Sequence, residues 1–103
     1  MYVVHCKREK FDVYIGRPNS DFPEGSPFCN PFVIGKDGTR SEVIEKYEIY
    51  LREALSELPG LDEELLKLDG KILGCWCYPK KCHGEVIIKL IKEIKRERKL
   101  IQF

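Results

Sequence analysis

The sequence predicts a small Rossmann-like α/β domain of three layers, with a short sheet that is mostly parallel or mixed. A length of 103 residues allows one hydrophobic core, so we expect a single domain over residues 1–103. Short apolar runs with strand-like composition lie at residues 1–6 and 71–76, and helical periodicity follows at residues 43–58 and again after residue 85. Strands that alternate with helices in this order favour a sheet covered by helices.

The first third of the chain contains two expected strands and a long irregular segment. Residues 1–6 predict the first strand, and residues 13–15 predict a short second strand that ends at Gly16. Residues 19–30 contain two Pro, one Gly and two Ser, so we expect a loop that crosses the surface or covers a site. Residues 31–34 predict one more brief strand before the turn at Lys36-Asp-Gly.

Helices account for most of the remaining sequence. Thr39 with Glu42 three residues later forms a capping-box pattern, which predicts a helix start. The expected core residues of that helix recur until Pro59-Gly60 and are Val43, Ile44, Tyr47, Leu51, Ala54, Leu55 and Leu58. Residues 62–68 predict a short helix capped by Asp62, and a strand over residues 71–76 leads to the last helix. The expected core residues of this last helix are Val86, Ile87, Leu90, Ile91 and Ile94.

The turn between the last strand and the last helix concentrates reactive side chains. Three thiols, an imidazole and two lysines lie there, namely Cys75, Cys77, Lys80, Lys81, Cys82 and His83. In open α/β sheets, ligands bind at the carboxyl ends of the strands. The free N–H groups and the dipole at a helix start favour a nearby anion or thiolate. The sequence therefore predicts that the functional site lies at this turn.

Three interpretations of the turn remain open on the residues alone. Cys82 at a helix start, beside lysines and His83, meets the conditions for a thiolate nucleophile, and Lys80 and Lys81 meet those for binding a phosphate. If Cys75 and Cys77 lie on a strand, they point to one face and, with Cys82 or His83, would supply the ligands of a tetrahedral zinc ion. A structural role as small buried apolar residues is the third interpretation.

Composition excludes several classes of protein. The net charge of +1 gives no general attraction to nucleic acid or membrane, and no apolar run approaches the roughly 20 residues of a membrane span. We expect a cytoplasmic protein, and the uneven spacing of five cysteines favours reduced thiols. Abundant Lys, Glu and Ile with few Asn and Gln is a balance seen in thermophiles, where intracellular disulfides do occur, so a disulfide is the alternative to reduced thiols. Apolar residues at the end of the chain suggest a homodimer contact: Leu100, Ile101 and Phe103.

Four segments together resemble an uncharacterised family, domain of unknown function 4326 (DUF4326). They are Tyr14-Ile-Gly-Arg17, Asn30-Pro-Phe32, the helix start from Gly38-Thr-Arg40 to Tyr47, and Leu73-Gly-Cys-Trp-Cys-Tyr-Pro-Lys-Lys-Cys-His-Gly84. Domains of this family occur in phage, archaeal and bacterial proteins. The resemblance implies a compact Rossmann-like fold without an established reaction. The motif positions that it implies are Arg17, Asn30, Arg40, Cys75, Cys77, Pro79, Cys82 and His83. Cys29 departs from the pattern, which usually has glycine there.

Physical roles follow for three of these residues. The planar guanidinium of Arg17 is suited to donate hydrogen bonds to a phosphate or carboxylate, or else to a loop carbonyl. Asn30 before Pro31 either caps the loop through its backbone or presents its amide to a base or sugar. Arg40 opposes the dipole at its helix start, so a compensating partner is expected, either an anion or the carboxylates of Glu42 to Glu45.

We therefore expect a domain that binds a nucleotide-like or phosphorylated small ligand through Arg17, Asn30, Arg40, Cys75, Cys77, Lys80 and Lys81. If the domain is an enzyme, hydrolysis or transfer at a nucleoside or nucleotide, with Cys82 and His83 as catalytic residues, is the expected reaction. The alternative is a zinc-stabilised binding module that uses Cys75, Cys77, Cys82 and His83, with its basic last helix on nucleic acid.

Overall fold

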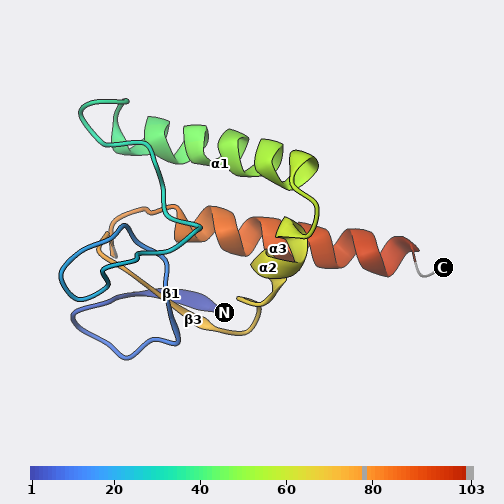
Figure 1. The fold of residues 1–103 in the computed structure, drawn as a ribbon, viewed down its shortest axis with the longest axis horizontal. Coiled ribbons are helices and arrows are strands. Elements are labelled where there is room, and N and C mark those ends of the chain that lie inside the picture. Colours follow the sequence, from blue (N-terminus) through green and yellow to red (C-terminus); the bar gives the residue numbers. More distant parts are fainter. Residues whose placement is uncertain (78, 102–103) are drawn as a thin grey trace.

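The structure is a computed structural model that describes residues 1–77 and 79–101, with only the backbone given for residues 100 and 101. The dimer contact expected at Leu100, Ile101 and Phe103 thus lies outside the described side chains. Figure 1 shows the arrangement of the chain. Its elements are, in order, β1 (Tyr2–His5), β2 (Val13–Tyr14), α1 (Arg40–Glu57), α2 (Leu61–Leu66), β3 (Ile72–Cys75) and α3 (Gly84–Ile101).

The sheet has three strands in the order β1-β3-β2, and both edge strands run parallel to β3. His5 pairs with Cys75, and Tyr14 pairs with Gly74. The carboxyl ends of the strands therefore lie at one edge, from which the chain continues into the 15–39 segment and into α3. A mixed α/β domain with a short parallel sheet is confirmed.

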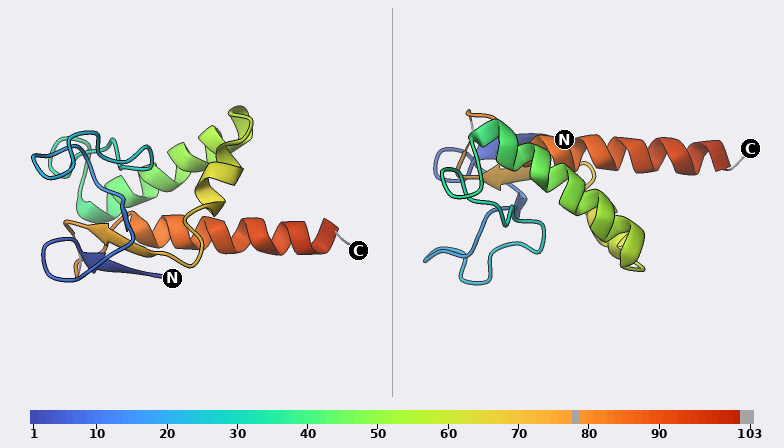
Figure 2. Two further views of the ribbon diagram at one scale, coloured as in Figure 1. Left: turned by 60° about the horizontal axis from the view of Figure 1, so that its bottom comes forward. Right: turned by 90° about the horizontal axis from the view of Figure 1, so that it is seen from above.

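The helices lie on one side of the sheet, where α3 packs next to the strands and α1 lies beyond it (Figures 1 and 2). Loop aromatics cover the opposite face: Phe22 stacks on Tyr14 at 4.0 Å and contacts Phe11 at 5.7 Å between ring centroids. Gly74 makes room for this cover, because a Cβ there would lie 2.6 Å from the Phe11 ring. The three-layer, Rossmann-like arrangement is not confirmed.

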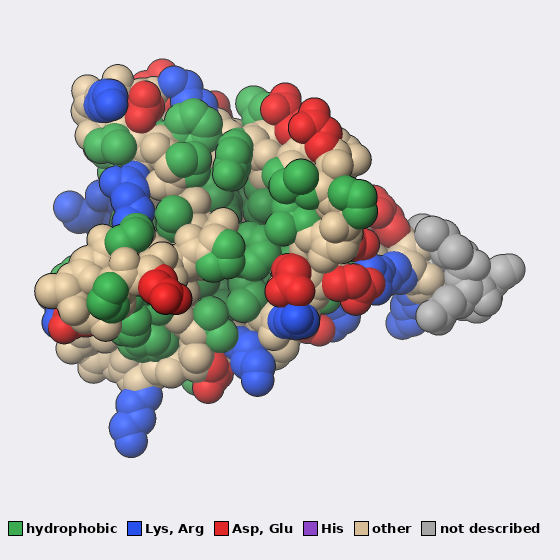
Figure 3. All heavy atoms as spheres, in the orientation of Figure 1, with side chains coloured by type: hydrophobic (Ala, Val, Ile, Leu, Met, Phe, Trp, Pro, Cys, Tyr) green, Lys and Arg blue, Asp and Glu red, His purple; other side chains and the backbone are tan. Residues whose placement is uncertain are grey.

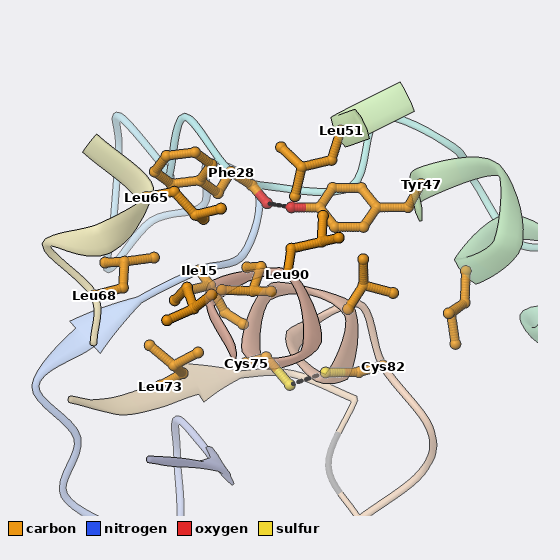
Figure 4. Packing of buried hydrophobic residues seen from close by; sticks show 14 residues of the cluster. Ile15, Phe28, Tyr47, Leu51, Leu65, Leu68, Leu73, Cys75, Cys82 and Leu90 are labelled. Carbon is orange, nitrogen blue, oxygen red and sulfur yellow. Dashed lines mark hydrogen bonds between the residues drawn. The ribbon is translucent and has the colours of Figure 1, made fainter. Parts of the chain in front are cut away.

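The core lies between the sheet and the helices, as Figure 4 shows. Side chains without solvent exposure come from β3, α1, α2 and α3, including Leu73, Tyr47, Leu65 and Ile87. Most of the residues that the helical spacing places in the core are buried or half-buried. Leu58 is an exception at 56% exposure, because it follows the last turn of α1 as the C-cap residue.

Local signals predicted the helix starts with mixed success. The Thr39 capping box is confirmed, since the Thr39 hydroxyl accepts from the Glu42 N–H and the Glu42 carboxylate accepts from the Thr39 N–H. Asp62 is not the N-cap of α2. That position belongs to Gly60, whose φ of 86° suits glycine.

The strand expected at residues 31–34 is wrong. This segment forms a turn in which the Val33 N–H donates to the Asp37 carboxylate, and only an isolated bridge joins Ile34 to Gly38. The backbone groups are satisfied locally, so the segment has no need of a neighbouring strand.

Candidate functional site

A cavity of about 420 Å³ lies at the carboxyl ends of β2 and β3. Its walls come from the segment after β2, the start of α1, and the turn that joins β3 to α3. The lining residues are Tyr14, Gly16, Arg17, Pro18, Asn19, Asn30, Phe32, Val33, Ile34, Arg40, Val43, Ile44, Cys75, Trp76, Cys77, Lys81, Cys82 and His83. The cavity therefore brings together residues that are up to about 70 positions apart in the sequence, at the sheet edge where parallel sheets bind ligands.

Three thiols meet on the β3–α3 side of the cavity. The Cys75 S–H donates to the Cys82 sulfur at 3.2 Å, and the Gly84 N–H donates to the same sulfur at 3.2 Å. The hydrogen bond from Cys75, helped by the one from Gly84, lowers the pKa of Cys82 although burial opposes this. The hydrogen bond with Cys75, together with burial, raises the pKa of half-buried Cys77. Of Cys77 and Cys82, Cys82 is therefore the one whose thiolate form these contacts favour.

His83 is buried, with 6% exposure, and packs edge-on against Tyr47 at 5.0 Å between ring centroids. Its Nε2 lies 2.8 Å from the Ile15 carbonyl oxygen. A carbonyl only accepts, so Nε2 carries a proton and the neutral ring keeps a lone pair on Nδ1. Burial lowers the pKa of His83, which keeps the imidazole neutral near pH 7.

Arg17 and Asn30 organise the loop on the other side of the cavity. The Arg17 guanidinium donates to the carbonyls of Asn30 and Phe32, at 2.9 and 2.7 Å. The Asn30 side chain accepts from the Phe32 N–H and donates to the Val43 carbonyl. Both residues therefore make the backbone contacts that were one of their two expected roles, and they also line the cavity.

Arg40 joins the start of α1 to the β3–α3 turn. Its Nη1 donates to the Lys81 carbonyl at 3.1 Å, so this partner is a backbone oxygen and not the anion or the Glu42 to Glu45 carboxylates that were expected. Arg40 also hydrogen-bonds the Cys77 thiol and thereby opposes the rise in its pKa. Lys81 lines the cavity, whereas the exposed neighbour Lys80 is not among the lining residues.

The charged side chains that line the cavity are all cationic. The lining includes Arg17, Arg40 and Lys81 but no Asp or Glu. Elsewhere on the described surface, cations commonly meet carboxylates, as in the Arg52–Glu93 and Lys95–Asp69 pairs. Figure 3 shows hydrophobic side chains in the hollow between α1 and the lower part of the molecule, with Lys and Arg side chains at its left margin. The cavity is thus suited to an anion that also has an apolar part.

Aromatic residues form the part of the site that sequence reasoning did not assign to it. Phe32 and Trp76 line the cavity, and the Trp76 ring is 45% exposed. Tyr14 holds this wall in place, because its hydroxyl accepts from Trp76 Nε1 and from the Asn19 amide and donates to the Arg17 carbonyl. Phe32 lies inside the Asn30-Pro-Phe32 segment, which was the available signal. Trp76 was expected within the strand at residues 71–76, but β3 ends at Cys75.

The zinc alternative finds no support in the side-chain geometry. In residues 1–77 and 79–101, no group of three or more His, Cys, Asp or Glu side chains is arranged to hold a metal ion. The premise that Cys75 and Cys77 share one face of a strand is wrong, because β3 ends at Cys75. His83 directs Nε2 to the Ile15 carbonyl.

The positive charge of the basic last helix is partly neutralised by its neighbours. Lys89 pairs with Glu48 of α1, Lys95 pairs with Asp69, and Arg98 pairs with Asp62 of α2. This reduces the positive field that a nucleic-acid surface needs. Among the helices of the described chain, none combines the length and apolar character required to cross a membrane.

Comparison with known proteins agrees with the motif resemblance. The family model described as "Domain of unknown function (DUF4326)" matches residues 4–93. The chain is similar to "Uncharacterized protein R718" of Acanthamoeba polyphaga mimivirus, with 34% identity over 91% of this chain and 82% of the relative. It is also similar to "Uncharacterized 12.4 kDa protein in nrdA-td intergenic region" of Enterobacteria phage T4, with 30% identity over 92% of this chain and 81% of the relative. No solved structure matches. With the family model covering most of its length, the chain belongs to the DUF4326 family.

Proposed function

We propose that the cavity binds a nucleotide-like, phosphorylated small molecule. The observation that carries the proposal is a lining with three cationic side chains, aromatic rings and no carboxylate. Such a lining favours a ligand with an anionic end and a planar apolar end. A volume of about 420 Å³ falls within the usual range for small-molecule sites.

The phosphate is best placed beside Arg40 and Lys81, where α3 begins. Arg40 uses one nitrogen on the Lys81 carbonyl, so other guanidinium N–H donors remain for the ligand. The 18-residue helix α3 begins at the same place, and although its first N–H groups already donate to Cys82 and His83, its axial dipole adds partial positive charge there. This arrangement matches the placement of phosphates in Rossmann-like domains, at the carboxyl ends of parallel strands.

The planar part of the ligand is best placed against Phe32 and Trp76. Aromatic rings stack on the face of any nucleobase, and the exposed Trp76 ring gains most from being covered. Its indole is oriented by the hydrogen bond to the Tyr14 hydroxyl at 3.1 Å. The site is thereby partly organised before a ligand binds.

We further propose that Cys82 and His83 support hydrolysis or transfer on the bound nucleotide. The pKa of the Cys82 thiol is lowered, which favours its nucleophilic form. Neutral His83 has a lone pair on Nδ1 that can accept a proton from an attacking water. Release of free base from AMP, followed by chromatography, tests the reaction. Loss of that release in Cys82→Ser would support the assignment, and turnover unaffected by Cys82→Ser and His83→Gln would contradict it.

The binding proposal is tested by thermal shift and titration calorimetry with AMP, GMP, CMP and UMP against the uncharged nucleosides. We expect a saturable rise in Tm with at least one monophosphate, and a smaller rise with its nucleoside, because a ligand that binds the folded state stabilises it by mass action. Affinity should fall as salt is added.

The neighbouring lysines provide a matched control. Lys81→Gln should weaken nucleotide binding about 5- to 20-fold, because it removes a lining cation. Lys80→Gln removes the same charge one residue away from the lining and should leave the affinity nearly unchanged. Equal losses in the two variants, or equal shifts with nucleoside and nucleotide, would overturn the proposal.

A further inference from the structure

Two sulfur atoms lie unusually close at the end of β3. Cys75 is the last residue of that strand and Cys82 lies two residues before α3, yet their sulfurs are 3.2 Å apart (Figure 4). Both side chains are buried, with 1% and 4% exposure. A disulfide needs about 2.05 Å between the sulfurs, so a movement of roughly 1 Å would bring them to bonding distance.

The packing of the turn holds the two sulfurs near each other. A Cβ at Gly84 would lie 2.6 Å from Cγ2 of Val3 and 3.3 Å from the Cys82 sulfur, so only glycine allows α3 to begin this close to β1. The Gly84 N–H donates to the Cys82 sulfur and directs it toward β3. The contact between the thiols is therefore imposed by the tertiary structure.

We propose that Cys75 and Cys82 are a redox modification site and form a reversible disulfide when the protein meets a peroxide. The Cys82 thiolate attacks one oxygen of hydrogen peroxide, the O–O bond breaks, and Cys82 sulfenic acid and hydroxide result. The Cys75 thiol then displaces the sulfenic oxygen, which leaves as water after protonation. Two electrons pass from the two sulfurs to the peroxide.

Access and reactivity both favour this pair. Both cysteines are lining residues of the cavity, which offers a molecule as small as hydrogen peroxide a path toward them. Hydrogen bonds from Cys75 and Gly84 stabilise the thiolate form of Cys82. The proposal stands independently of the identity of the ligand in the cavity.

Oxidation should tie the end of β3 to the start of α3. The bond closes a short loop between Cys75 and Cys82, and such a cross-link limits the unfolded chain. We expect the oxidised protein to unfold several degrees above the reduced protein, by up to roughly 10 °C. Dithiothreitol should reverse this shift.

Peptide mapping of the full chain tests the proposal. Reduced protein is treated with a slight excess of hydrogen peroxide, alkylated and digested with trypsin without reduction. Cleavage after Lys71, Lys80 and Lys81 separates the peptide 72–80, which contains Cys75 and Cys77, from the peptide 82–89, which contains Cys82. We expect these two peptides to be joined, and the intact mass to fall by about 2 Da as two thiol hydrogens are lost.

Single substitutions identify the partners. The linked peptides should persist in Cys77→Ser and in the control Cys29→Ser, and should be absent in Cys75→Ser and Cys82→Ser. A link lost only in Cys77→Ser would overturn the assignment to Cys75. Oxidation of wild-type protein to sulfinic acid without any link would overturn the proposal, and this result needs no variant to fold.

Discussion

The hydroxyl of Tyr47 anchors the cavity loop to α1, and its removal should have a measurable cost. Tyr47 has no solvent exposure, and its hydroxyl donates to the Phe28 carbonyl at 2.6 Å. Burial raises the pKa of Tyr47, so the hydroxyl stays protonated throughout the usual pH range. Phe28 immediately precedes the segment that supplies Asn30 and Phe32 to the cavity.

Tyr47→Phe deletes only this hydrogen bond, because the ring and its edge contact with His83 remain. The buried Phe28 carbonyl loses its tyrosine donor, which raises the cost above that of an average hydrogen bond. We expect a loss of about 1.5–2 kcal/mol in the free energy of unfolding. For a chain of 103 residues, this corresponds to a fall in Tm of roughly 6–10 °C.

Urea unfolding followed by far-UV circular dichroism measures the loss. The midpoint should fall while the m-value stays constant, because the native fold is retained. Tyr50→Phe is the matched control: Tyr50 lies on the same helix at 44% exposure, where water solvates either side chain, and its substitution should cost less than about 0.5 kcal/mol. Equal costs for the two substitutions would refute the claim that the Tyr47 hydroxyl holds the loop.

Three further predictions follow from single contacts. Burial lowers the pKa of His83 in the folded state. The contribution of neutral His83 to stability is therefore fully present above the unfolded pKa near 6.5, and the free energy of unfolding of the wild type should decline as the pH falls below it. His83→Gln should show a weaker decline between pH 7 and 5, and parallel curves for the two proteins in urea titrations would contradict the assignment. Gly74→Ala should cost about 1–3 kcal/mol, because the added Cβ would lie 2.6 Å from the Phe11 ring; an unchanged Tm would show that the ring moves freely. Glu93→Gln should lower the free energy of unfolding by less than about 1 kcal/mol, because the ion pair of Glu93 with Arg52 is exposed. The difference from wild type should shrink in 0.5 M salt, and a difference that does not change with salt would contradict a contribution from this pair.

Much of the local structure could be predicted from the sequence. The Thr39 capping box is read over four adjacent residues, and the spacing of Val43, Tyr47 and Leu51 reports one face of one helix. The turn at Cys82 and His83 was likewise identified by its position between a strand and a helix. These signals are visible in the sequence because the interacting groups lie within a few positions of one another.

The brief strand expected at residues 31–34 does not form, because its pairing depends on contacts beyond the local sequence. Apolar composition favours a strand only if a neighbouring strand is available, and here the Val33 N–H is satisfied by Asp37 within the turn. Asp62 has the composition of an N-cap, but Gly60 occupies that position because the chain turns sharply there with φ of 86°.

The sequence by itself determined the helices and the α/β class, since short-range periodicity and capping specify them, and the motif residues were identified by the family resemblance. Only the tertiary structure decided how the site is assembled. Arg17, Arg40 and Lys81 come from three separate segments, and their shared cavity depends on how β2, α1 and the β3–α3 turn pack. The contact between the Cys75 and Cys82 sulfurs has the same origin, because the close packing of Gly84 against β1 sets where α3 begins.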